Sequence, residues 1–289
     1  MGKEDRGSRE FYGVPEPLGT LGAQFTMTSS PQDRTHVSPL TSNTPKARAM
    51  LLAAGRGERM RPLTDITPKP LLAVRGQPLM EWCLQRMAAG GLKNVVINTA
   101  WLGEQIPAAL GHTWSADGSD VPLQLRYSHE GIDFGGALET AGGIVRALPW
   151  LDEVFWVAAG DVFAPDFLFD ALAPARLAAS ACLAHLWLVP NPPHNRRGDF
   201  GLSDQGLALN LPAEHPGPRY TFSTIALYKQ ALFEPPWCDM ARGNPEGVKA
   251  PLAPLLRRAM DHGLVSASLY TGAWTDVGTP ERLAELNQG

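Results

Sequence analysis

The stretch LLAAGRGERMRPLTDITPKPLL, residues 51–72, joins an apolar run to two glycines and four basic side chains. The apolar residues from position 48 onward predict a buried β-strand. Gly55 and Gly57 follow where that strand ends, and ligands of open α/β sheets bind at the carboxyl ends of strands. The whole chain carries a formal net charge of only −4, so a local basic cluster predicts a strongly negative ligand. The members of this cluster are Arg56, Arg59, Arg61 and Lys69.

The segment after this stretch predicts a strand–helix–strand unit. Apolar side chains spaced three and four apart predict a helix over 78–89, which starts at a proline and ends at two glycines. NVVINT, residues 94–99, then predicts a second strand. Two strands joined by a helix in this way form a parallel pair with a right-handed crossover.

The alternation of strands and helices continues along the chain. We expect further strands over 123–128, 153–160, 181–189, 220–228 and 265–270. We expect further helices over 137–151, 165–173, 251–263 and 280–288. The segment DFGLSDQGLALN, residues 199–210, predicts a hairpin. The predicted fold class is therefore α/β, with a mostly parallel sheet whose second half carries antiparallel hairpins.

The first 46 residues differ in composition from the rest of the chain. They are rich in Ser, Thr and Pro and show no apolar period, which predicts a disordered leader over residues 1–46. Residues 47–289 are expected to form a single domain. The chain has 289 residues, of which 44% are hydrophobic, so a substantial core is available.

Charge, hydropathy and cysteine usage exclude several classes of protein. A net charge of −4 predicts no general affinity for nucleic acid. No apolar stretch reaches the ~18 residues of a membrane span and no signal peptide is recognisable, so no membrane contact is expected. The three cysteines include no CxxC pair, which predicts reduced thiols and a cytoplasmic protein. We expect a monomer or weak oligomer. The cysteines are Cys83, Cys182 and Cys238.

The glycine turn does not fit two common phosphate-binding motifs. A P-loop requires Gly-Lys-Ser/Thr, and here Gly57 is followed by Glu58 and Arg59. A dinucleotide-binding fingerprint requires a third glycine, and Met60 occupies that position. The turn still allows backbone N–H groups to approach an anion closely.

Lys69 is flanked by Pro68 and Pro70. The two prolines stiffen the backbone on both sides of the lysine, which suits a phosphate clamp beside the glycine turn. The alternative is a solvated lysine in a proline-rich surface loop.

Two aspartates end short apolar runs. Asp161 follows VFWVAAG, and Asp276 lies within AWTDVGT. A carboxylate at the edge of a core is costly unless it is paired or binds a metal. Two such carboxylates suit Mg²⁺, which takes a few protein oxygens and keeps its other positions for phosphates. The alternative is that both cap helices, because Pro165 and Pro280 follow shortly.

The motifs MLLAAGRGERMRPLT…TPKPLL, LETAGGI, AAGD and WTDVGT together resemble the sugar-1-phosphate nucleotidylyltransferases. The resemblance covers nearly all of residues 47–289 and keeps the family's motif order. It implies a Rossmann-like, mostly parallel mixed sheet flanked by helices, with a small β-rich sugar-binding insertion. It also implies that a sugar-1-phosphate oxygen attacks the α-phosphorus of a nucleoside triphosphate and releases pyrophosphate.

Further stretches narrow the resemblance within this family. VVINTAWLGEQI, RGDFGL, KAPLAPLLRRAM and WTDVGTPERL are most similar to the N-acetylmuramate-1-phosphate uridylyltransferases of peptidoglycan recycling. This implies UTP and N-acetylmuramate 1-phosphate as substrates. Mannose-1-phosphate guanylyltransferases and glucose-1-phosphate thymidylyl- or uridylyltransferases are the alternatives. An alternative of another class is a non-catalytic, nucleotide-sensing regulatory subunit.

The resemblance also implies roles for single residues. Arg59 and Lys69 would hold the triphosphate and the α-phosphoryl group, and Asp161 and Asp276 would bind Mg²⁺. The implied nucleotide-binding residues are Ala53, Ala54, Gly55, Gly57, Lys69, Asn98 and Gly142. The implied sugar-binding residues are Glu139, Asp199 and Lys249.

For two of these residues, the surrounding sequence also supports the implied role. Asp199 lies in HNRRGDF, where it is expected to accept a hydrogen bond from a sugar hydroxyl; a solvated surface loop is the alternative. Lys249 is expected at the start of a helix, where a cation is unfavourable unless a phosphate binds beside it. Arg196 or Arg197, in the same loop as Asp199, would pair with a lactyl carboxylate.

Overall fold

The computed structural model describes residues 46–116 and 122–288. These residues belong to one compact unit. Apart from Lys46, the predicted leader lies outside the described residues. No helix in the described part of the chain is long and apolar enough to cross a membrane.

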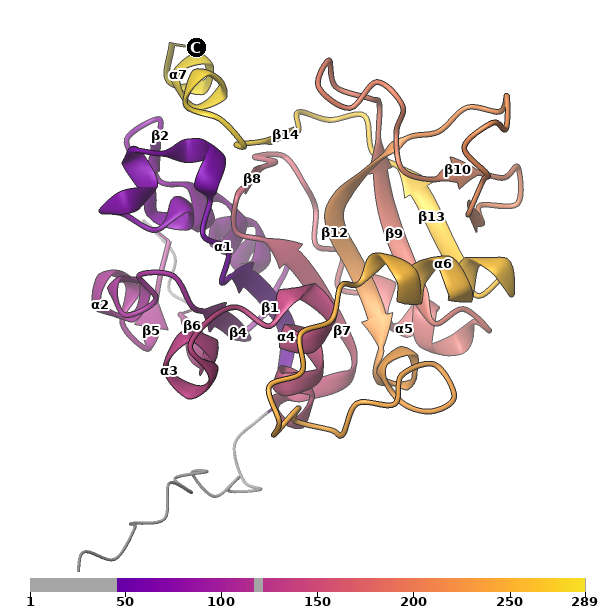
Figure 1. Ribbon diagram of the computed structural model, residues 1–289, viewed down its shortest axis with the longest axis horizontal. Coiled ribbons are helices and arrows are strands. Elements are labelled where there is room, and N and C mark those ends of the chain that lie inside the picture. Colours follow the sequence, from indigo (N-terminus) through magenta and orange to yellow (C-terminus); the bar gives the residue numbers. More distant parts are fainter. Residues whose placement is uncertain (1–45, 117–121, 289) are drawn as a thin grey trace, which may run out of the picture. The chain divides into compact units, whose positions relative to one another are not determined.

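An eight-stranded mixed sheet forms the centre of the fold (Figure 1). From edge to edge its strands are β13 (Val265–Leu269), β9 (Ala184–Val189), β12 (Thr221–Lys229), β7 (Leu151–Ala159), β1 (Ala47–Ala53), β4 (Asn94–Thr99), β6 (Leu123–His129) and β5 (Thr113–Trp114). The predicted parallel pair of β1 and β4 is confirmed, with Met50 opposite Val96. Strands β7 and β6 extend this parallel part on either side. Strand β12 runs antiparallel between β7 and β9, which makes the sheet mixed.

Helices cover both faces of the sheet, which explains the continuous apolar run of β1. The helices are α1 (Leu79–Ala89), α2 (Gln105–Leu110), α3 (Glu130–Phe134), α4 (Glu139–Ala147), α5 (Ala173–Ala179), α6 (Ala253–Asp261) and α7 (Pro280–Gln288). Met50 packs in one core cluster with residues of α4 and α6. Its neighbour Leu51 packs in the other, with residues of α1, α2 and α5. A strand buried on both faces needs apolar side chains at every position.

The predicted helix over 165–173 is wrong. This segment consists of turns and irregular backbone up to α5, which begins at Ala173. Phe167 and Phe169 are buried, whereas the Leu168 side chain between them is 64% exposed. The Phe169 ring lies 5.0 Å from the Trp156 ring of β7. Packing of alternate phenylalanines onto the sheet therefore overrides the helical spacing.

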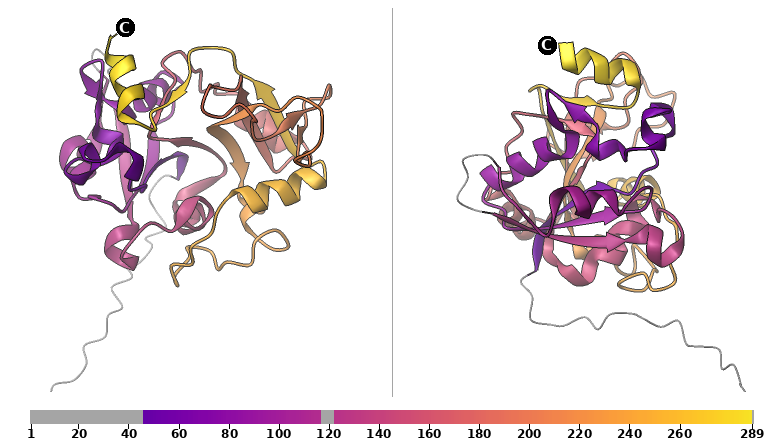
Figure 2. Two further views of the ribbon diagram at one scale, coloured as in Figure 1. Left: turned by 45° about the horizontal axis from the view of Figure 1, so that its top comes forward. Right: turned by 90° about the vertical axis from the view of Figure 1, so that its left-hand side faces the viewer.

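Short strands complete the fold. The predicted hairpin is confirmed as β10 (Gly201–Leu202) and β11 (Ala208–Leu209), which pair antiparallel. Strands β8 (Val162–Phe163) and β14 (Thr275–Asp276) form another antiparallel pair, and β2 (Ala73–Val74) pairs with β3 (Gln77–Pro78). Helix α7 lies beside β2 (Figure 2). Its Asn287 side chain donates a hydrogen bond of 3.1 Å to the Ala73 carbonyl of β2.

Candidate active site

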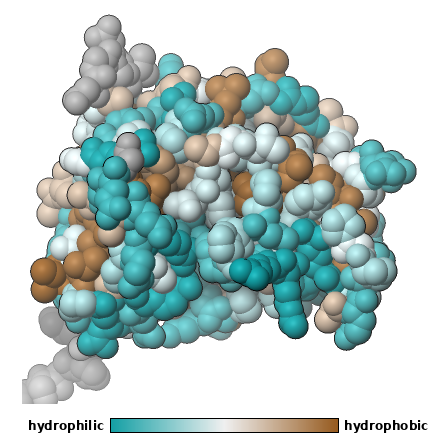
Figure 3. Space-filling view, turned by 90° about the horizontal axis from the view of Figure 1, so that it is seen from above, coloured by the Kyte–Doolittle hydropathy of each residue, from teal (hydrophilic) through white to brown (hydrophobic). Residues whose placement is uncertain are grey.

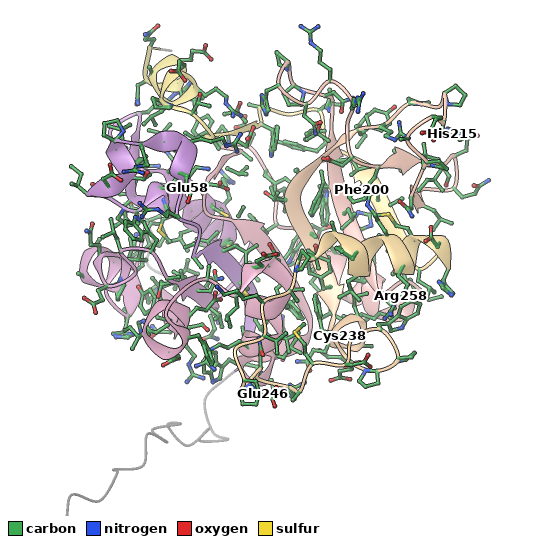
Figure 4. The ribbon with its side chains drawn as sticks, in the orientation of Figure 1. Glu58, Phe200, His215, Cys238, Glu246 and Arg258 are labelled. Atoms are coloured by element: carbon green, nitrogen blue, oxygen red, sulfur yellow. The ribbon has the colours of Figure 1, made fainter. Side chains whose placement is uncertain are left out.

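A cleft of about 840 Å³ opens at the carboxyl ends of β1 and β4, a size typical of small-molecule sites. Its two sides differ. The glycine-loop side is lined by Ala53, Ala54, Gly55, Gly57, Glu58, Arg59, Lys69, Asn98, Glu139 and Asp161. The apolar side is lined by Val157, Phe200, Phe222, Tyr228, Leu252 and Leu256. Figure 4 labels one residue of each side, Glu58 and Phe200. Figure 3 shows hydrophobic residues gathered among hydrophilic ones on the face seen from above.

The glycine turn wraps closely around Lys69. Gly57 has a φ of 66°, and a Cβ at this position would lie 3.1 Å from the Lys69 Cβ. The Thr64 hydroxyl donates a hydrogen bond of 2.9 Å to the Gly57 carbonyl. At Gly55, by contrast, a Cβ would meet no described atom within 4 Å. The backbone at Gly55 is therefore accessible to a ligand in the cleft.

The structure divides the basic cluster into two pairs. Arg59 and Lys69 line the cleft. The Arg56 guanidinium instead stacks on the Trp101 ring, 3.5 Å from its centroid. Arg61 forms an ion pair of 2.9 Å with the aspartate four residues later. Only half of the predicted cluster therefore faces the cleft, and the other half stabilises the loop that carries it.

Asp161 and Asp276 come from neighbouring chain segments in the fold, although they lie far apart in the sequence. Strand β14 pairs with β8 so that Asp276 is opposite Val162, and the Val277 N–H donates a hydrogen bond of 2.9 Å to the Asp161 carbonyl. Asp161 is followed by strand β8, and Asp276 is itself within a strand, so the alternative that they cap helices is wrong.

Both aspartates have cationic partners in the structure. The Lys69 ammonium pairs with the Asp161 carboxylate. Arg282 Nη1 lies 2.6 Å from Asp276 Oδ1, and His194 Nε2 lies 2.8 Å from the same oxygen. These ion pairs were not predicted from the sequence. They compensate two carboxylates whose side chains are 33% and 25% exposed.

The two carboxylates fit a magnesium site that substrate oxygens complete. Among residues 46–116 and 122–288, no group of three or more His, Cys, Asp and Glu side chains gathers as a metal cage. A structural zinc site would require such a cage. Mg²⁺ instead binds through one or two carboxylates together with substrate phosphates. Asp161 and Asp276 are carboxylates of the kind that such a site uses, and both side chains are partly accessible.

The fully buried carboxylate of Glu130 connects three segments beside the glycine-loop side: the end of β1, the end of β4 and the residue before α4. Its Oε1 accepts a hydrogen bond of 2.8 Å from the Asn98 amide, and its Oε2 accepts one of 2.8 Å from the Leu138 N–H. Asn98 Oδ1 in turn accepts a hydrogen bond of 2.8 Å from the Ala53 N–H. Burial raises the pKa of the Glu130 carboxyl, while these hydrogen bonds oppose the rise.

The Glu130 network was not anticipated from the sequence. The residue directly follows β6, and only His129 separates it from the end of the predicted strand, so the rule for polar residues at strand ends would have identified it. Its neighbour in space is Gly143, where a Cβ would lie 2.6 Å from Glu130 Oε1. This contact gives a steric reason for a glycine in the first turns of α4.

Gly142 lies behind the cleft wall. A Cβ there would lie 2.5 Å from the Val248 carbonyl oxygen. The N–H groups of Ala141 and Gly142 both donate to the Ala250 carbonyl, at 2.9 and 3.1 Å. The start of α4 is therefore bonded to the segment before α6. Glu139, the first residue of α4, lines the cleft and has a φ of 59°.

Asp199 and Lys249 do not line the cleft. The Asp199 carboxylate accepts a hydrogen bond of 2.8 Å from the N–H of Phe222, a residue of the apolar side. The prediction that Lys249 opens a helix is wrong, because α6 begins at Ala253. Lys249 is exposed in the extended segment that contacts the start of α4. Asp276 likewise lies outside the lining, although Gly278 belongs to it.

Known proteins match this chain along nearly all of its described residues. The family model described as "Nucleotidyl transferase" matches residues 48–289. A relative from Neisseria meningitidis, "N-acetylmuramate alpha-1-phosphate uridylyltransferase", is 46% identical over 82% of this chain and 96% of its own. A protein of the same name from Caulobacter vibrioides is 30% identical over 83% and 95%. A "UTP--glucose-1-phosphate uridylyltransferase" from Synechocystis is 29% identical over 80% and 60%.

Solved structures share the fold at low sequence identity. The inositol-1-phosphate CTP transferase from T. maritima aligns with a TM-score of 0.59 and 18% identity, over 84% of this chain and 96% of its own. HddC from Yersinia pseudotuberculosis aligns with a TM-score of 0.60 and 16% identity, over 84% and 98%. At this identity the likeness concerns the fold alone.

Proposed function

The chain belongs to the nucleotidyl transferase family, and we propose that it transfers the uridylyl group of UTP to N-acetylmuramate 1-phosphate, releasing pyrophosphate. The relatives from Neisseria and Caulobacter, which are matched over nearly their full length, support this choice of substrates. One structural observation carries the proposal: cationic and carboxylate side chains line one side of a single cleft, and aromatic and aliphatic side chains line the other.

The glycine-loop side suits transfer at a phosphorus atom. Such transfers need little covalent chemistry from the protein, and depend on positioning and on neutralising a crowded negative charge. We assign Arg59 to the triphosphate and Lys69 to the α-phosphoryl group. Arg59 is exposed at the cleft, whereas Lys69 is held in place by its flanking prolines and by the close packing of Gly57. An amine held in this way needs little reorganisation when charge develops.

The nucleotide is proposed to lie against the end of β1 and the start of α4. The residues assigned to it are Ala53, Ala54, Gly55, Gly57, Lys69 and Asn98, with Gly142 supporting the wall from behind. The Asn98 side chain is fixed by Ala53 and by Glu130, so the wall is rigid before a ligand arrives. A rigid site loses less entropy on binding.

Mg²⁺ is proposed as the cofactor, held by Asp161 and Asp276. When bound, it would neutralise phosphate oxygens and polarise the α-phosphoryl group. The Lys69 ammonium pairs with Asp161 in the structure, so both groups belong to one electrostatic unit. A cation at Asp161 would compete for that carboxylate and favour contact between Lys69 and phosphate.

The sugar is proposed to occupy the apolar side. Acetamido and lactyl groups each carry a methyl group, which aromatic and aliphatic walls accommodate better than water does. Glu139 is assigned to the sugar from the other wall. Asp199, which accepts a hydrogen bond from the Phe222 N–H, is assigned to the sugar on the apolar side. Lys249 is also assigned to the sugar, from the segment beside α4.

A substrate matrix tests the proposed function. Four nucleoside triphosphates are combined with the 1-phosphates of N-acetylmuramic acid, N-acetylglucosamine, glucose and mannose, and pyrophosphate release is measured. We expect the highest kcat/KM for UTP with N-acetylmuramate 1-phosphate. A preference for GTP with mannose 1-phosphate would overturn the assignment. Binding of nucleotide without pyrophosphate release from any pair would favour the regulatory alternative.

A further inference from the structure

Strand β12 is irregular where it lines the cleft. Its register against β9 shifts between Phe222 and Ala226, and Thr224 within this bulge has a φ of 62°. A positive φ is a genuine outlier for a β-branched residue. Among the described residues, five other than glycine have a positive φ, and two of them, Glu139 and Thr224, line the cleft. Backbone strain of this kind gathers at functional sites.

The neighbouring residue Ser223 holds the bulge from behind. Its hydroxyl donates a hydrogen bond of 2.6 Å to the Trp187 carbonyl and accepts one of 3.1 Å from the Ile225 N–H. Its carbonyl accepts a hydrogen bond of 3.1 Å from the Trp274 indole. Ser223 is fully buried, so these bonds fix the backbone on both sides of Thr224. The surrounding structure therefore imposes the strained conformation.

The Thr224 hydroxyl is prepared to accept a hydrogen bond. It donates its proton to the Ser223 carbonyl over 2.6 Å, which leaves its lone pairs available. The residue is half-buried and lies in the cleft wall together with Phe222 and Tyr228 of the same strand. A ligand that buries this oxygen must supply a donor, because an unpaired buried acceptor is costly.

We propose that Thr224 determines specificity for the sugar 1-phosphate, with its Oγ1 accepting a hydrogen bond from an O–H or acetamido N–H of the sugar. The bulge of β12 keeps this oxygen at the cleft wall. This inference rests on the proposed function, since it assigns the apolar side to the sugar. It adds a polar contact from β12 to a wall that is otherwise mainly aromatic and aliphatic.

Two variants isolate the oxygen atom. Thr224→Ser keeps it and Thr224→Ala removes it, while both lack the methyl group. We expect Thr224→Ala to raise KM for the sugar 1-phosphate about 3- to 10-fold over Thr224→Ser, as the loss of one neutral hydrogen bond predicts. KM for UTP should stay the same in both variants. Equal sugar KM values in the two variants, or an equal change in KM for UTP, would overturn the proposal.

A third variant tests the strained backbone. Thr224→Gly should melt about 2 °C above Thr224→Ala, because glycine adopts a positive φ without steric cost, and its sugar KM should be at least as high. Leu102→Gly is the matched control, since Leu102 also has a positive φ, of 48°, but does not line the cleft. It should leave both KM values unchanged. A lower melting temperature for Thr224→Gly than for Thr224→Ala would overturn the strain argument.

The design separates this inference from the proposed function. If the wild-type protein releases no pyrophosphate with any sugar 1-phosphate, the proposed function and the inference both fail. If the wild type is active and the Ser and Ala variants bind the sugar equally, only the role of Thr224 fails.

Discussion

The two sides of the cleft are built in different ways. The glycine-loop side takes most of its residues from one short stretch, residues 53–69, and two of its charged groups, Lys69 and Asp161, pair with each other. The apolar side takes its residues from β7, β12, α6 and the segments that precede α6 and β10. Its one conspicuous polar feature is the strained Thr224.

From this difference we expect the glycine-loop side to support the reaction itself and the apolar side to select the sugar. The glycine-loop side contains groups that suit any nucleoside triphosphate: a glycine turn, two cations and Asp161, one of the two carboxylates that we propose for a metal. The apolar side offers shape and a few hydrogen-bonding atoms, and such contacts discriminate between related sugars by modest factors. Substitutions on the first side should therefore abolish turnover, whereas those on the second should alter substrate preference.

The largest effect is expected from Asp161→Asn. Removing this carboxylate should lower kcat by about 10²–10³-fold, the range measured when one transition-state charge partner is lost. Pyrophosphate release is the readout, and melting temperature reports the fold. Asp166→Asn is the control, because Asp166 is exposed and outside the cleft lining. Excess EDTA should abolish activity of the wild type, and full activity in EDTA would contradict a magnesium site.

Lys69→Ala should have the next largest effect, with kcat lowered by about 10²-fold. The loop should keep its shape, because Thr64 and the flanking prolines hold it without the amine. The freed Asp161 carboxylate is partly exposed and can be hydrated. Arg61→Ala, in the same loop but outside the cleft lining, should keep kcat near the wild-type value. An unfolded Lys69→Ala whose folded fraction has normal kcat would make the lysine structural.

The sequence predicted those parts of the site that lie close together in the chain. The strand, the glycine turn and the proline-flanked Lys69 are local features, and local features leave local signals. The pairing of β14 with β8 and the ion pair of Asp276 with His194 join segments that are far apart in the chain, and no local pattern records them.

The same distinction explains the errors in secondary structure. The helix expected over 165–173 fails because Phe167 and Phe169 find aromatic partners on the sheet. Lys249 was expected to begin a helix, but its segment instead bonds to the start of α4 through the Ala250 carbonyl. In both cases a tertiary contact decides between two conformations that the local sequence allows.

Glu130→Gln tests the buried network beneath the glycine-loop side, with an intermediate effect. Each carboxylate oxygen accepts from a different donor, so an amide must place its NH₂ against Asn98 or Leu138. The orphaned donor should cost about 1–3 kcal/mol of unfolding free energy. We also expect about a 10-fold rise in KM for UTP, because Asn98 and Ala53 lose their support. A loss of stability with an unchanged KM for UTP would contradict a positioning role.

The same variant should change the pH dependence of stability. Burial raises the pKa of Glu130 above its ordinary value of 4.5, so the folded state keeps the proton to a higher pH than the unfolded state does. The wild type therefore loses stability from this group as pH rises from 4.5 through the folded-state pKa. The stability difference between wild type and Glu130→Gln should be largest near pH 4.5 and shrink above it. A difference that is independent of pH would contradict the raised pKa.

The smallest effect is expected from the two arginines near the apolar side, Arg196 and Arg197. Both side chains are exposed and lie outside the cleft lining, in the loop that precedes Asp199. A lactyl carboxylate is an anion that glucose and mannose 1-phosphates lack, and a guanidinium pairs with it in a bidentate geometry. Exposed ion pairs contribute little, so changing the correct arginine to Ala should raise KM for N-acetylmuramate 1-phosphate only about 2- to 5-fold.

N-acetylglucosamine 1-phosphate provides the matched comparison, because it keeps the acetamido group and lacks the carboxylate. Its KM should not change in either arginine variant, and added salt should weaken the effect on the lactyl sugar because exposed charges are screened. Equal changes for both sugars would refute the pairing. That outcome would leave discrimination between them to the shape of the apolar side, because an acetamido group would reach Thr224 in both sugars alike.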